Sequence, residues 1–143
     1  MSLVRRSAIV RQTARRMFDL VNNVAAYPRR FDWCHEAQVL EQDEGMVVAR
    51  LGLSLGGLRT GFTTRNTLRP PEAILMELVD GPFNRLAGSW QFLPLGADAC
   101  KVTLELDFEV AGRLVGSAMA FGFQGLADRM VEDFCREAGR SGG

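Results

Sequence analysis

The stretch CKVTLELDFEVAGRLVGSAMAFGFQGLADRMVEDFCREAGR, residues 100–140, changes its hydrophobic period once, near Gly112. Before that point apolar and polar residues alternate, which predicts a strand over 100–110 with one face toward a core and the other toward water. From Arg113 to Arg140 there is no proline, and apolar residues recur every three or four positions. That spacing predicts one long amphipathic helix. A half-buried strand is thus followed by a helix that can cover it.

Upstream of this stretch the chain repeats the period of two. The predicted strands are MVVARLGLSL (46–55), LRTGFTTRNTL (58–68), AILMELV (73–79) and GSWQFLPL (88–95). Gly56-Gly57 is a hairpin signal between the first two, and Pro70-Pro71 ends the second because proline cannot donate to a ladder. The short connections favour antiparallel pairing.

The N-terminal part predicts a first strand and two short helices. Residues 4–12 are rich enough in β-formers to be a strand, and Thr13 is a suitable N-cap for the helix that follows. Asn22-Asn23 ends that helix, and Pro28 suits the first turn of another. The sequence therefore predicts a single α+β domain over residues 1–143, in which a curved antiparallel sheet of about seven strands wraps around the long C-terminal helix.

The apolar residues facing inward have two interpretations, a filled core or a partly empty cavity. Cavities lined by apolar and aromatic side chains are the usual sites for lipid-like ligands, and methionine suits them because it repacks easily. The candidate cavity residues are Tyr27, Phe31, Trp33, Phe62, Met76, Trp90, Phe92, Met119, Phe123, Leu126 and Met130. The first three crowd a short connector, where they would either plug one end of the core or form the rim of an opening.

Positive charge is concentrated at the start of a chain whose net charge is zero. Residues 1–31 contain seven arginines and one acidic residue. Such asymmetry can mark a surface for RNA or anionic lipid, and a solvated helix face is the plainer interpretation. The candidate anion-binding residues are Arg15, Arg16, Arg29 and Arg30.

Motifs for catalysis or metal binding are not found in the sequence. His35 is the single histidine, and its neighbour Cys34 would point to the opposite face of a strand. The three cysteines lack ligand spacing, and no glycine-rich nucleotide motif occurs. We therefore expect a buried Cys34, an exposed His35, no catalytic residues, no metal and no enzymatic activity. Unpaired cysteines and the lack of a signal peptide or long apolar run predict a cytoplasmic protein, with peripheral contact at the inner membrane left open.

Four segments carry a family resemblance. In order, LVNNVAAYPRRFDWC (20–34), FTTRNTL (62–68), LVDGPFNRLAGSWQFLPL (78–95) and ACKVTLELDFEV (99–110) resemble the coenzyme Q-binding START-like family, within the polyketide cyclase/dehydrase and lipid transport superfamily. The chain departs from the family at Arg29, Arg30 and Asp32, where relatives commonly carry an acid, an aromatic residue and a proline. That change makes the expected tunnel entrance more basic.

The resemblance implies a helix-grip (START-like, Bet v 1-like) fold around an apolar tunnel. It implies a non-catalytic carrier or chaperone for an isoprenoid lipid, a polyprenyl quinone such as ubiquinone, that supports respiratory electron transport without any other cofactor. One family member, a ribosome-association toxin, implies the alternative, which is binding to the large ribosomal subunit and its rRNA and a block of subunit association. The superfamily implies a third, weaker alternative, an aromatic polyketide cyclase, for which Arg65, Asn66 and Asp80 are the candidate polar groups in the tunnel.

Overall fold

The computed structural model describes residues 2–55, 58–112 and 114–141; of residues 2, 55, 58, 114–120 and 141 it describes the backbone alone. The predicted hairpin turn Gly56-Gly57 lies outside the described residues. In chain order the elements are β1 (Ser2–Val10), α1 (Ala14–Asn22), the 3-10 turn η1 (Val24–Ala26), α2 (Tyr27–Arg30), β2 (Cys34–Asp43), β3 (Met46–Leu55), β4 (Leu58–Arg69), β5 (Ala73–Asp80), β6 (Phe83–Pro94), β7 (Cys100–Val110) and α3 (Leu114–Ser141).

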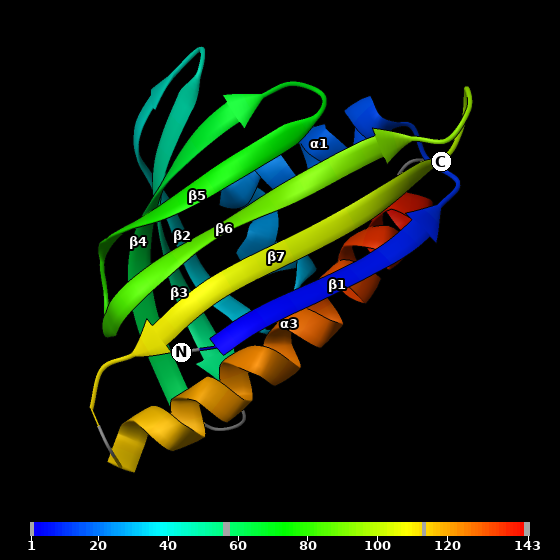
Figure 1. The fold of residues 1–143 in the computed structure, drawn as a ribbon. Coiled ribbons are helices and arrows are strands. Elements are labelled where there is room, and N and C mark those ends of the chain that lie inside the picture. Colours follow the sequence, from blue (N-terminus) through cyan, green and yellow to red (C-terminus); the bar gives the residue numbers. More distant parts are fainter. Residues whose placement is uncertain (1, 56–57, 113, 142–143) are drawn as a thin grey trace.

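The strands form one antiparallel sheet in the order β1-β7-β6-β5-β4-β3-β2. Strands adjacent in the chain pair with each other from β2 to β7, and β1 pairs with β7 at the other edge. Register shifts in β2, β5 and β6 mark bulges, which bend a strand and increase its twist. The sheet is therefore curved, as Figure 1 shows, and the predicted helix-grip architecture is confirmed.

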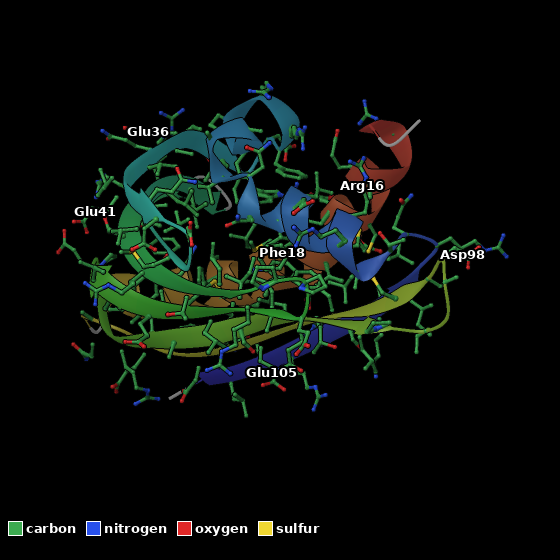
Figure 2. All side chains as sticks on the ribbon, turned by 90° about the horizontal axis from the view of Figure 1, so that it is seen from above. Arg16, Phe18, Glu36, Glu41, Asp98 and Glu105 are labelled. Carbon is green, nitrogen blue, oxygen red and sulfur yellow. The ribbon has the colours of Figure 1, made fainter. Side chains whose placement is uncertain are left out.

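All the helices lie on the concave side of the sheet. Figure 2 shows Phe18 of α1 in the interior, whereas Glu105 of β7 projects from the opposite face of the sheet. In α1 the backbone N–H of Arg16 donates to Thr13 Oγ1 at 3.0 Å, which confirms the predicted N-cap. Pro28 occupies the first turn of α2, where its missing N–H leaves no helical bond unmade.

Two aromatic clusters attach α3 to the rest of the protein. In one, the ring of Phe123 packs against Phe108 with the centroids 4.9 Å apart and also contacts Phe62 and Phe83. In the other, Phe134 packs among the rings of Tyr27, Phe31, Trp33 and Trp90 at centroid distances of 4.7–6.1 Å. The two phenylalanines are about 16 Å apart along the helix at ~1.5 Å rise per residue. The helix is thus anchored at two separate points.

Strand β6 begins at Phe83, earlier than the predicted start at Gly88. The register shifts between Phe83 and Arg85, so the two buried residues Phe83 and Leu86 are three positions apart instead of two or four. The bulge hides the alternation on which the sequence-based prediction depends.

Two glycines allow a direct stability test. An added Cβ at Gly125, on the exposed side of α3, would have no atom within 4 Å, so Gly125→Ala should raise the free energy of unfolding by roughly 0.5–1 kcal/mol. At Gly88 an added Cβ would lie 2.4 Å from the carbonyl oxygen of Glu105. Gly88→Ala should therefore cost about 1–3 kcal/mol. Urea denaturation measures both, and equal effects of the two substitutions would contradict the packing described.

Candidate functional site

An internal cavity of about 70 Å³ lies between the concave face of the sheet and the helices. Its walls come from β3 to β7 on one side and from α1, η1, α2 and α3 on the other. Most of the predicted cavity residues line it: Tyr27, Phe62, Met76, Trp90, Phe123, Leu126 and Met130. Their role in ligand binding stays a prediction.

The position of the cavity follows from how α3 is held. Phe62 and Phe123 belong to one aromatic cluster, and Tyr27 and Trp90 belong to the other. All four line the cavity, so it occupies the space between the two anchors. On the sheet side small inward side chains, such as that of Ala49, leave this space unfilled. An anchored helix cannot move toward the sheet to close the gap.

The walls contain few polar groups. The hydroxyl of Tyr27 donates to the backbone carbonyl of Val21, and burial raises the pKa of this phenol, so it remains a protonated donor. Thr64 and Asn66, both buried on β4, are the other polar side chains that line the cavity. Of the three polar candidates for the tunnel, Asn66 is inside, whereas Arg65 and Asp80 are exposed.

The remaining predicted cavity residues lie elsewhere. Phe92 is buried beside the cavity wall, where it stacks on Trp90 and contacts Phe18 edge-on. Met119 falls among the residues of α3 whose side chains lie outside the described part of the chain.

Of the two interpretations of Tyr27, Phe31 and Trp33, the structure supports the plug and contradicts the rim. Their exposed fractions are 5%, 5% and 1%, and only Tyr27 reaches the cavity. Phe31 stacks on Trp33 with ring centroids 4.8 Å apart, and both rings pack around Phe134. The connector plugs one end of the core, because α3 supplies a partner ring from a hundred residues further along the chain.

A polar groove of about 290 Å³ lies on the outside of this plug, between α2 and the C-terminal half of α3. We call it the arginine groove; its residues are Arg30, Phe31, Asp32, Arg129, Asp133, Arg136, Glu137 and Arg140. Arg129 pairs with Asp32 at 2.8 Å, and Arg136 pairs with Asp133 at 3.0 Å. In the part of the chain that the structure describes, Arg30 and Arg140 make no ion pair.

The four arginines predicted as one anion-binding surface are divided by the structure. Arg30 lines the arginine groove, and Arg29 is exposed on the same short helix. Arg15 pairs with Asp19 at 3.7 Å. Arg16 is half-buried and donates to the carbonyl of Ala138 near the end of α3 (Figure 2).

Most of the positive charge of the groove comes from three residues that were not predicted from the sequence, Arg129, Arg136 and Arg140. Arg129 and Arg136 are seven positions apart, and Arg136 and Arg140 are four apart, so the three lie on one face of the helix. This spacing is the feature of the sequence that could have identified them. Acidic residues at intervening positions concealed it, since the net charge of the segment is low.

The thiols are poorly suited to nucleophilic chemistry. Cys34 is buried and His35 is exposed, as predicted. Burial raises the pKa of Cys34 and Cys100, and it raises the pKa of Cys135 to about 11, so all three remain protonated at neutral pH. Among the described residues no cluster of histidine, cysteine and acidic side chains could hold a metal ion, and no helix is long and apolar enough to cross a membrane. The lack of catalysis stays a prediction.

Comparison with known proteins gives a consistent set of relatives. The family described as polyketide cyclase / dehydrase and lipid transport matches residues 10–135. The ribosome association toxin RatA of Pseudomonas aeruginosa is 46% identical over 94% of both chains. The persistence and stress-resistance toxin PasT of Escherichia coli is 41% identical over 94% of this chain and 85% of its own length. Among solved structures, the Zhui aromatase/cyclase from Streptomyces has the same fold, with a TM-score of 0.87 and 21% identity over 97% of this chain and 94% of its own.

The plug and the groove share one contact that a mutation can test. The indole N–H of Trp33 donates to Asp133 Oδ2 at 2.9 Å. Asp133→Ala would leave this buried donor unpaired, so the free energy of unfolding should fall by about 1–3 kcal/mol. The matched control is Asp32→Ala in the same groove: its side chain is 85% exposed, and its loss should cost less than about 0.5 kcal/mol. Urea denaturation followed by circular dichroism would measure both, and a cost at Asp133 no larger than at Asp32 would contradict the assigned role of Asp133.

Proposed function

Because the chain belongs to the polyketide cyclase/dehydrase and lipid transport family, and its near relatives are named ribosome association toxins, we propose that it associates with ribosomes. By binding the large subunit it would block association with the small one. The observation that carries this proposal is the 46% identity to a protein of that name over almost the full length of both chains.

The arginine groove supports this proposal with a surface of suitable chemistry. Guanidinium groups bind phosphate oxygens in bidentate geometry, and phosphate contacts dominate the affinity of proteins for nucleic acids. Arg30 and Arg140 make no ion pair in the described part of the chain, so they can bind phosphate without breaking one. The acids of the groove hold Arg129 and Arg136 in fixed positions beside them. The groove therefore offers rRNA two open arginines and two oriented ones.

Co-sedimentation with purified large ribosomal subunits at several salt concentrations tests this role. The double variant Arg30→Ser/Arg140→Ser should bind more weakly. The slope of log affinity against log salt should be shallower by about 1.5, because two phosphate contacts are lost. In sucrose gradients the variant should also leave more subunits associated than the unmodified protein does.

The matched control is Arg59→Ser/Arg69→Ser, which removes the same charge from exposed positions of β4 outside the groove. Equal loss of binding in both double variants would mean that net charge, and not the groove, determines affinity. Full binding by the Arg30/Arg140 variant would move the contact to another surface. No binding of the unmodified protein to subunits would overturn the proposed function.

The cavity favours a second candidate function, the binding of an apolar ligand, for which ubiquinone is our proposal. Burial of an isoprenoid tail contributes roughly 25 cal/mol per Å². The cavity of about 70 Å³ is smaller than the ~300–1,000 Å³ of typical ligand sites, so a ligand must enlarge it. Met76 and Met130 in its walls are the side chains that adapt most easily. This function and ribosome association use separate surfaces and are compatible.

Filling the cavity tests the second function. Ala49 is buried in the cavity wall, and Ala49→Leu should abolish uptake of a short-tailed ubiquinone while keeping the protein folded. Quenching of Trp90, which lines the cavity, reports binding by fluorescence. The control is Ala87→Leu on the exposed face of β6, which should bind like the unmodified protein. Equal quenching in both variants would place the ligand outside the cavity.

A further inference from the structure

Asn66 is an unusual residue for the wall of an apolar cavity. Its side chain lies on the concave face of β4, and the residue is 9% exposed. Its cross-strand neighbours are Val47 on β3 and Met76 on β5, neither of which offers a side-chain hydrogen bond. A buried amide costs free energy unless its donors and acceptors are paired. Its hydrogen bonds therefore indicate what it is placed to bind.

Only the oxygen of the Asn66 amide has a partner. The hydroxyl of Thr64, two positions earlier on the same face, donates to Asn66 Oδ1 at 2.9 Å. No hydrogen bond within the described residues engages Asn66 Nδ2. Thr64 thus fixes the oxygen end of the amide and leaves the two N–H donors of Nδ2 available in the cavity wall.

Other polar groups of the cavity do not compete for these donors. The Tyr27 hydroxyl donates to the carbonyl of Val21, and among the described residues it makes no hydrogen bond with Asn66. The cavity lining contains no charged side chain among the described residues. Across the sheet, the row of Asn66 continues through Met76 to Gly88, which contributes no side chain and so no polar group to that row.

We propose that Asn66 recognises a ligand carbonyl, and that the cavity selects apolar ring compounds bearing a ketone or quinone oxygen. The Nδ2 donors match an uncharged acceptor, whereas a pure hydrocarbon would leave them unpaired and an anion would lack a compensating cation. Thr64 is a positioning residue, since it acts only through the orientation of the Asn66 amide. This inference rests on the proposed ligand-binding function of the cavity and names the ligand's chemical class.

A pair of compounds with matched shape tests the inference. Duroquinone and durene share a six-membered ring with four methyl groups at the same positions, and the two ring carbons that are carbonyls in duroquinone carry hydrogen in durene. Every carbon of the duroquinone ring is substituted, so addition to the protein's thiols is suppressed. Titration calorimetry of both compounds against the unmodified protein and Asn66→Leu separates apolar burial from carbonyl recognition. Asn66→Leu should weaken duroquinone binding by roughly three- to tenfold and should not weaken durene binding.

An infrared measurement gives a readout that a purely structural role would not change. The carbonyl stretch of bound duroquinone should lie at lower frequency in the unmodified protein than in Asn66→Leu, because a hydrogen bond weakens the C=O bond. Thr64→Val should give an intermediate frequency and a smaller loss of affinity, since the donors remain but the amide is no longer held. Retained durene binding shows that each variant has kept its fold.

The outcomes distinguish the two levels of the proposal. Selective loss of duroquinone affinity with a shifted carbonyl stretch supports recognition by Asn66. Unchanged affinity for both compounds, or equal losses with an unchanged stretch, overturns the role of Asn66 and leaves the cavity as an unselective apolar site. If the unmodified protein binds neither compound, both the ligand-binding function and this inference are overturned.

Discussion

The packing of Phe134 is the interaction on which the rest of the structure depends. Its ring is fully buried among side chains from α2, from the connection between α2 and β2, and from β6, and so joins α3 to both layers of the protein. A sheet with one apolar face needs a cover, and α3 is the one long helix among the described residues that can provide it. Phe123 provides the second anchor, so the helix is fixed in position and in rotation.

Both candidate sites are consequences of this anchoring. The cavity exists because the helix between its two anchors cannot approach the sheet, where small residues leave space. The arginine groove exists because the same anchoring places the C-terminal half of α3 beside α2. Tyr27 lines the cavity, whereas the neighbouring Trp33 bonds to Asp133 in the groove. One aromatic plug therefore separates an apolar site from a charged one.

Sequence patterns predicted the elements well where a local rule applied. The alternation over 100–110 and the N-cap at Thr13 depend on side chains a few positions apart, and both are confirmed. The start of β6 was missed because a bulge after Phe83 interrupts the alternation. The cavity wall was predicted in large part, since inward-facing positions follow from strand and helix periodicity. The groove was missed because its halves are a hundred residues apart in the chain.

The sequence by itself determined the type and order of the elements, the inward face of each strand, and membership of the family. Only the tertiary structure decided that Trp33 is a plug and not a rim, and that Arg30 lies near Arg140. The physical reason is that periodicity encodes which side of an element is apolar. The contacts between elements depend on where a few large rings, above all Phe134, find space to pack.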